Sequence, residues 1–170
     1  EMSAPAVAQA VAQALDTHDF ILVNFANADM VGHTGNFNAT VGAIEALDRA
    51  IAVIVSAVLK RGGALIITSD HGNAEEKLYR GTGEARTKHT PNPVPFFLVA
   101  SEVQWKDERR DADIGKCYRN VRGVLADVAP TALELLGLRP SYEMTGVSLL
   151  KILLSKSPRS RHFARCGLPG

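Results

Sequence analysis

The 170-residue sequence has little of several features that mark whole classes of protein. It holds only two cysteines, Cys117 and Cys166, which lie far apart and lack the paired spacing of a zinc site. No apolar run reaches the roughly 18 residues of a membrane span, and the N-terminus lacks the basic-then-apolar order of a signal peptide. No glycine-rich Walker loop is present either. We therefore expect a reduced, cytoplasmic protein that does not span a membrane, and nucleotide hydrolysis by the Walker route has no support.

The charges nearly cancel, with a formal net charge of +1. The field of the whole chain therefore gives no reason to expect nucleic acid as a partner. The exception is the C-terminal end, where a basic run contains no acidic residue: Lys151, Lys156, Arg159, Arg161 and Arg165. We expect residues 155–170 to form a flexible, solvated tail and residues 1–154 to form one domain or a piece of one.

The spacing of apolar residues predicts alternating helices and strands. Recurrence at three and four positions predicts helices over residues 3–15, 38–61 and 126–137. Continuous apolar runs of strand length predict buried strands over residues 20–27, 64–68 and 94–100.

End signals accompany the predicted helices. Ser3 precedes the first helix, Asn36 or Asn38 begins the second, and Asp127 is expected to cap the third. Gly62 and Gly137 follow the second and third helices as stop signals.

The order strand, long helix, strand is typical of a right-handed crossover between parallel strands. We therefore expect an α/β fold in which helices cover both faces of a mostly parallel sheet. In such sheets, ligands bind beyond the carboxyl ends of the strands.

Candidate metal ligands lie in the loops around these predicted strands. Asp29 and His33 follow the first strand, Asp70 and His71 follow the second, and His89 shortly precedes the third. Carboxylate and imidazole are ligands of Zn²⁺, Mn²⁺ and Fe²⁺.

The spacing of these residues constrains how they can bind an ion. Asp29 and His33 can reach one ion if their segment makes a helical turn. Asp70 and His71 cannot share a face of a regular strand, so either a turn begins between them, for which Gly72 is well placed, or they serve different ions.

Other polar residues near these loops have plainer interpretations. Glu75 and Glu76 are expected to be surface carboxylates, with a place behind the metal ligands as the alternative. Arg86 and Lys88 flank His89 and form either an exposed face or a contact to a phosphate oxygen. Trp105 is expected to pack.

Four segments together resemble one enzyme family. "VNFANADMVGHTGNFNATVGAIEALD", "IITSDHGNAEE", "TKHTPNPVPFFLV" and "LADVAPTALELLG" with "MTGVSLL" are similar, in order and separation, to the C-terminal part of cofactor-independent (2,3-bisphosphoglycerate-independent) phosphoglycerate mutase. The resemblance covers about residues 1–150. It implies an alkaline phosphatase-like, three-layer sandwich around a mostly parallel sheet, incomplete at its N-terminal side.

The resemblance also implies a chemistry. By analogy with the family, Asp29, His33 and His89 hold one manganese-type ion, and Asp70 and His71 help to hold a second. The implied cofactors are two divalent ions, with Mn²⁺ expected and Mg²⁺, Co²⁺ and Zn²⁺ as alternatives, and no 2,3-bisphosphoglycerate. The implied reaction interconverts 3-phosphoglycerate and 2-phosphoglycerate through a phosphoserine, as a step of glycolysis and gluconeogenesis.

The chain departs from the family pattern in what it lacks. The nucleophilic serine, a further aspartate ligand and the substrate-binding residues have no counterpart here, so no catalytic residue is assigned to this chain. The resemblance implies that an N-terminal part of the same protein supplies them and that the chain alone is inactive. Alternatives are a related two-metal phosphatase or phosphopentomutase, and a non-catalytic metal-binding or interaction fragment. An unpaired strand would also favour dimerisation or aggregation.

Overall fold

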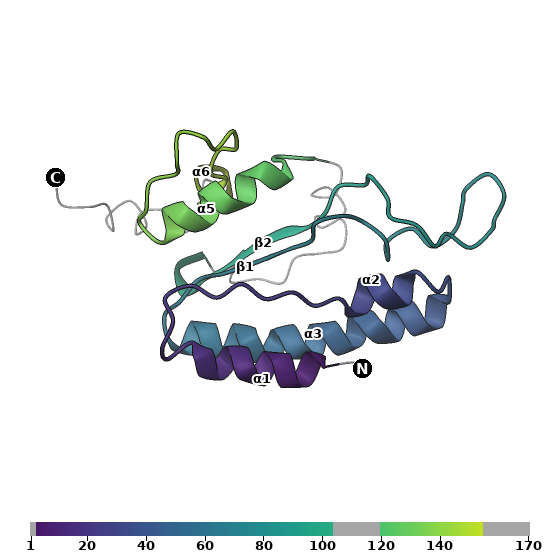
Figure 1. The fold of residues 1–170 in the computed structure, drawn as a ribbon, viewed down its shortest axis with the longest axis horizontal. Coiled ribbons are helices and arrows are strands. Elements are labelled where there is room, and N and C mark those ends of the chain that lie inside the picture. The colour runs from purple at the N-terminus through teal and green to yellow at the C-terminus, as the bar shows by residue number, and fades with distance from the viewer. Residues whose placement is uncertain (1–2, 104–119, 155–170) are drawn as a thin grey trace. The chain divides into compact units, whose positions relative to one another are not determined.

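The computed structural model describes residues 3–103 and 120–154, which fall into two compact units (Figure 1). The first unit contains Glu1–Arg61 and His71–Val94, and the second contains Gly62–Asp70 and Pro95–Gly170. Within the described ranges, no helix combines the length and the apolar character needed to cross a bilayer. The predictions for Cys117, Cys166, Trp105 and the basic tail lie outside the described residues.

Helices α1 (Ala4–Ala14) and α3 (Phe37–Lys60) pack side by side in the first unit (Figure 1). Small and branched residues at helical spacing are buried on both, Ala4, Ala8 and Val11 on α1 and Ala46, Ala50, Ile54 and Val58 on α3. The side chain of Asn36 accepts a hydrogen bond from the Ala39 amide at 3.0 Å, which confirms it as the cap of α3. Ser3 occupies the cap position of α1, but its side chain makes no capping bond.

The predicted strand over residues 20–27 is wrong. Within the described residues this segment belongs to no β-sheet, and its last residue, Asn27, begins helix α2 (Asn27–Gly32). Burial along it alternates: Phe20 and Leu22 are exposed, and Ile21 and Val23 are half-buried. An apolar run encodes a tendency to be extended, but a strand also needs a partner for its amide and carbonyl groups.

The second unit contains a two-stranded antiparallel sheet, so the predicted parallel pairing is also wrong for the described residues. Strand β1 (Leu65–Thr68) pairs with β2 (Phe96–Val99), with Leu65 opposite Val99. The chain between them folds back on itself through the bridges Gly72–Thr90 and Leu78–Ala85. Strand β2 therefore runs antiparallel to β1. The composition of a strand does not encode this direction.

The remaining described elements of the second unit are short helices. They are two 3₁₀ turns, η1 (Ser101–Val103) and η2 (Leu125–Asp127), followed by α5 (Val128–Leu135) and α6 (Leu150–Leu154). Gly137 has a φ of 71° and ends α5 as predicted.

Asp127 stands at the N-cap position of α5, but its side chain does not cap that helix. Its carboxylate instead accepts hydrogen bonds from the amides of Val124 and Val147, both at 2.8 Å. The fully buried hydroxyl of Thr131 bonds the Asp127 carbonyl at 2.7 Å and accepts from the Leu149 amide at 2.9 Å. These bonds join η2 and α5 to the segment before α6, which sequence spacing did not indicate.

The Asp127 carboxylate makes stability depend on pH. Hydrogen bonds from the Val124 and Val147 amides hold the pKa of Asp127 below its ordinary value of 3.8. A carboxyl with a depressed pKa stabilises the fold above its unfolded pKa, and this contribution is lost as pH falls through the folded pKa. Asp127→Asn should therefore lower the unfolding free energy most near pH 6, and the difference should shrink as the pH falls below about 4.

Urea unfolding at a series of pH values measures this effect. Glu134→Gln, on the exposed side of α5, is the matched control and should show no such trend. A difference between wild type and Asp127→Asn that stays constant across the pH range would contradict the assignment.

Candidate metal centre

Asp29 and His33 lie on one side of helix α2. Asp29 is in its first turn, and His33 is the residue that ends it. The Asp29 Oδ1 and His33 Nε2 atoms are 3.3 Å apart. The helical turn that the spacing required is therefore present.

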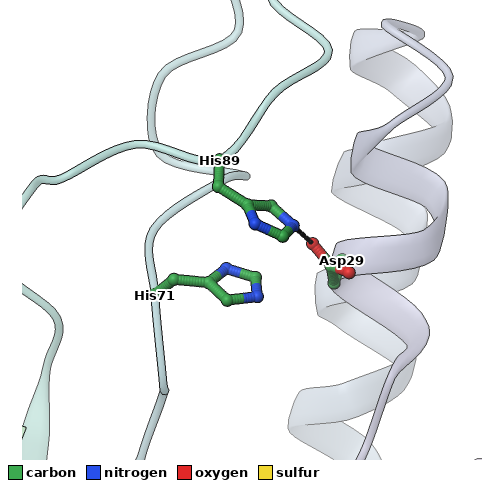
Figure 2. A group of neighbouring side chains, drawn as sticks. All are labelled: Asp29, His71 and His89. Atoms are coloured by element: carbon green, nitrogen blue, oxygen red, sulfur yellow. Dashed lines mark ion pairs between the residues drawn. The ribbon is translucent and has the colours of Figure 1, made fainter.

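His71 and His89 approach Asp29 from the segment His71–Val94. The bridge between Gly72 and Thr90, with the Thr90 amide 2.8 Å from the Gly72 carbonyl, brings the two histidines together. Their rings stack with centroids 3.6 Å apart and planes inclined by 19°. Figure 2 shows both rings directed at Asp29, and His89 Nε2 lies 3.1 Å from Asp29 Oδ1.

The distances among these atoms fit the ligands of a divalent cation. Asp29 Oδ1 is 3.1 Å from His89 Nε2, and the Nε2 atoms of His33 and His89 are also 3.1 Å apart. Zn²⁺ ligands at about 2.0–2.2 Å from the ion lie about 3–3.6 Å from one another in ordinary geometries. Asp29, His71 and His89 also place one ligand atom each within 4.8 Å of one another.

The tautomer of His33 supports the same conclusion. His33 Nδ1 lies 2.6 Å from the Thr87 carbonyl oxygen. Because a carbonyl only accepts, Nδ1 carries the proton and donates, which leaves the lone pair of a neutral ring on Nε2. That lone pair faces the carboxylate of Asp29, an arrangement that a cation or a shared proton must stabilise.

Asp70 ends the segment Gly62–Asp70 and belongs to the second unit, unlike the other four predicted ligands. The chain bends at Asp70 and His71, so these residues do not continue the strand. The assignment of both to a second ion stays a prediction.

Asn73 is a site residue that the sequence did not reveal. It is buried, and its Nδ2 donates to Asp29 Oδ1 at 2.7 Å and contacts the Asp29 carbonyl at 3.3 Å. Burial alone would raise the pKa of Asp29, but the bond from Asn73, and the charges of the three neighbouring histidines where these are protonated, outweigh it. The pKa of Asp29 therefore lies below its ordinary value, which favours the ionised form that binds a cation.

Glu75 forms hydrogen bonds with residues that lie beside the candidate ligands. Its Oε2 accepts from the Asn73 amide at 2.7 Å, and its Oε1 accepts from the Thr90 hydroxyl and from Asn92 Nδ2. Burial would raise the pKa of Glu75, but these hydrogen bonds lower it below its ordinary value. Glu75 is exposed, as expected of a surface carboxylate, and its hydrogen bonds also reach Asn73 and Thr90 beside the candidate ligands.

The neighbouring charged residues Glu76 and Arg86 also form contacts within the protein. Glu76 accepts from Asn92 at 2.9 Å and pairs with Arg86 at 3.6 Å. The guanidinium of Arg86 also lies over the Tyr79 ring, 5.1 Å from its centroid. Arg86 is thus part of the protein scaffold in this structure, and Lys88 remains exposed.

Comparison with known proteins places this geometry in a family. Residues 1–140 match the family model described as the Metalloenzyme superfamily. This chain belongs to the metalloenzyme superfamily. Membership agrees with the convergence of carboxylate and imidazole ligands around Asp29, and it supports use of a divalent metal.

Two relatives of this chain share one name. The chain is 49% identical over 152 residues to the 2,3-bisphosphoglycerate-independent phosphoglycerate mutase of Chloroflexus aggregans, a match that covers 88% of this chain and 27% of that protein. It is 47% identical over 152 residues to the protein of that name from Pseudomonas fluorescens, with the same coverage. The resemblance read from the sequence is confirmed. The chain spans little more than a quarter of the length of these relatives.

A solved structure gives the same result for the fold. A phosphoglycerate mutase from Leishmania mexicana, crystallised at low cobalt concentration, superposes with a TM-score of 0.67 at 30% identity, over 85% of this chain and 28% of that one. The α/β class is therefore shown for the described part of this superfamily member.

Proposed function

We propose that this chain is the metal-binding segment of a phosphoglycerate mutase that interconverts 3-phosphoglycerate and 2-phosphoglycerate through a phosphoserine intermediate. The observation that carries the proposal is the convergence of Asp29 Oδ1 with the Nε2 atoms of His33 and His89. The shared name of its relatives from Chloroflexus and Pseudomonas supports the choice of reaction.

In this proposal Asp29, His33 and His89 hold one divalent ion, and Asp70 and His71 help to hold a second. Bound ions supply positive charge that activates a serine hydroxyl and stabilises phosphoryl oxygens. The chain's own part is to present ionised Asp29 and to fix His33 by its bond to the Thr87 carbonyl. Mn²⁺ is the expected ion, and Co²⁺ is a natural probe because a related structure was obtained with cobalt.

The rest of the proposed enzyme completes both the site and the sheet. The nucleophile and the groups that bind phosphoglycerate are expected in the remainder of a longer protein. The three-layer sandwich with a mostly parallel sheet would form there, with strands beside the apolar segment 20–27. Residues 1–170 alone are therefore expected to be inactive.

A chimaera tests the proposal. The segment of the Chloroflexus aggregans relative that matches this chain is replaced by residues 1–154, and interconversion of the two phosphoglycerates is measured with Mn²⁺ present. We expect activity in the chimaera, loss of that activity in its His89→Ala variant, and none in the isolated chain.

The other outcomes separate the alternatives. A folded chimaera that hydrolyses general phosphomonoesters but not phosphoglycerates would favour a related two-metal phosphatase. A folded chimaera with no phosphoryl-transfer activity would overturn the proposal in favour of a non-catalytic metal-binding fragment. Measurable mutase activity of residues 1–170 alone would overturn the assignment of the nucleophile to the rest of the protein.

A further inference from the structure

Lys77 is a buried lysine in a stretch, "NAEEKLYR", that reads as a solvated surface. Only 7% of the residue is exposed. Its Nζ donates to the Gly32 carbonyl at 2.7 Å and to Asn73 Oδ1 at 2.8 Å. Burying an ammonium is costly, and a methionine of similar length would fill the space without that cost. The two bonds therefore call for a role beyond packing.

The bond from Lys77 to Asn73 decides which way the Asn73 amide points. An ammonium has only donors, so the atom of Asn73 that faces Lys77 must be the oxygen. The amide nitrogen is then turned to Asp29, where it donates to Oδ1 at 2.7 Å. Without Lys77 the amide could rotate and present its oxygen to the Asp29 carboxylate, where two acceptors would repel.

The bond from Lys77 to the Gly32 carbonyl holds helix α2, which carries Asp29. Gly32 is the last residue of that helix, and its carbonyl accepts from the Gly35 amide at 3.2 Å as well as from Lys77. The end of helix α2 and Asn73 are closely packed, because a Cβ on Gly32 would lie 2.6 Å from Asn73 Oδ1. One ammonium thus fixes both the helix that carries the ligand and the amide that orients it.

We propose that Lys77 is a positioning residue of the metal centre, which acts through Asn73 to orient the Asp29 carboxylate toward the ion. This inference rests on the metal centre of the proposed function. Partners behind a ligand commonly change metal affinity by about 10- to 100-fold when they are removed.

The test is a titration of the metal-free 170-residue chain with Mn²⁺ by calorimetry, with Co²⁺ absorption as a second readout. Lys77→Met should weaken Mn²⁺ binding by about 10- to 100-fold and alter the Co²⁺ ligand-field bands. Lys60→Met, which removes an exposed lysine at the end of α3, is the control for charge and should change neither.

A double-mutant cycle separates orientation of Asn73 from general destabilisation. If Lys77 acts through Asn73, Lys77→Met should add little to the loss caused by Asn73→Ala. Losses that add fully would overturn the inference, because Lys77 would then act by another route.

Two further outcomes are decisive. If Lys77→Met does not fold, Lys77→Gln replaces it: its amide can still donate to the Gly32 carbonyl but can also accept from a rotated Asn73, so weaker binding is again expected. Wild-type affinity in a folded Lys77 variant would overturn this inference and leave the metal centre intact. Absence of Mn²⁺ binding in the wild type would overturn the metal centre itself.

Discussion

Asp29→Ala should weaken Mn²⁺ binding by more than about 100-fold, since even the loss of a partner behind a ligand costs about 10- to 100-fold. Asp29 Oδ1 is the atom on which the cluster centres, 3.3 Å from His33 Nε2 and 3.1 Å from His89 Nε2. It is also the carboxylate that the hydrogen bond from Asn73, together with the neighbouring histidines where they are protonated, favours in its ionised form. Its removal takes away both a ligand and the charge that offsets the ion.

Calorimetric titration of the metal-free chain measures this loss. Asp48→Ala is the matched control, because Asp48 is an exposed aspartate of the long helix α3 and should leave the affinity unchanged. Asp29→Asn keeps the shape of the side chain but loses its charge, and it should weaken Mn²⁺ binding about as much as Asp29→Ala does. Undiminished affinity in both Asp29 variants would show that the ion binds elsewhere in the chain.

Gly146→Ala should destabilise the second unit by about 3 kcal/mol or more, at or beyond the upper end of the usual cost of overpacking. A Cβ at this position would overlap the carbonyl group of Ala126 and lie 2.9 Å from the Asp127 amide nitrogen. Both obstacles are backbone atoms, and the bond between the Val147 amide and Asp127 holds the two segments together. No rotation of a side chain can relieve the overlap.

The same substitution at another glycine provides the control. Gly42 lies inside α3, and a Cβ there would meet nothing within 4 Å. Gly42→Ala should therefore stabilise the chain by about 0.5–1 kcal/mol, because alanine favours the helix. Urea unfolding monitored by circular dichroism compares the two variants, and equal effects of the same sign would contradict the packing argument.

Local sequence patterns predicted the helices well and the sheet poorly. The limits of α3 follow from apolar spacing, the Asn36 cap and Gly62, all of which act within one turn of the helix. The pairing of β1 with β2 depends on how the chain between Thr68 and Phe96 folds back, and no local pattern encodes that path. The segment 20–27 was misread for the same reason, since a strand requires a partner.

The candidate site divides in the same way. The sequence indicated four candidate ligands by residue type and by their places near the ends of predicted strands, and the structure brings them together: Asp29, His33, His71 and His89. Their supporting residues gave no such signal: Asn73 is a neutral amide, and a lysine that follows two glutamates is usually solvated. The role of Asn73 emerges only when its segment meets helix α2.

The candidate metal ligands of the first unit come from stretches far apart in the chain, namely α2 and the two arms of the segment bridged at Gly72 and Thr90. An ion held by them would act as a removable cross-link that closes long loops of the polypeptide. The free energy of binding would then add to the free energy of folding, so free Mn²⁺ should raise the melting temperature. At a free concentration of one hundred times Kd, binding would stabilise the fold by about 2.7 kcal/mol. In such a molecule a chelator acts as a mild denaturant.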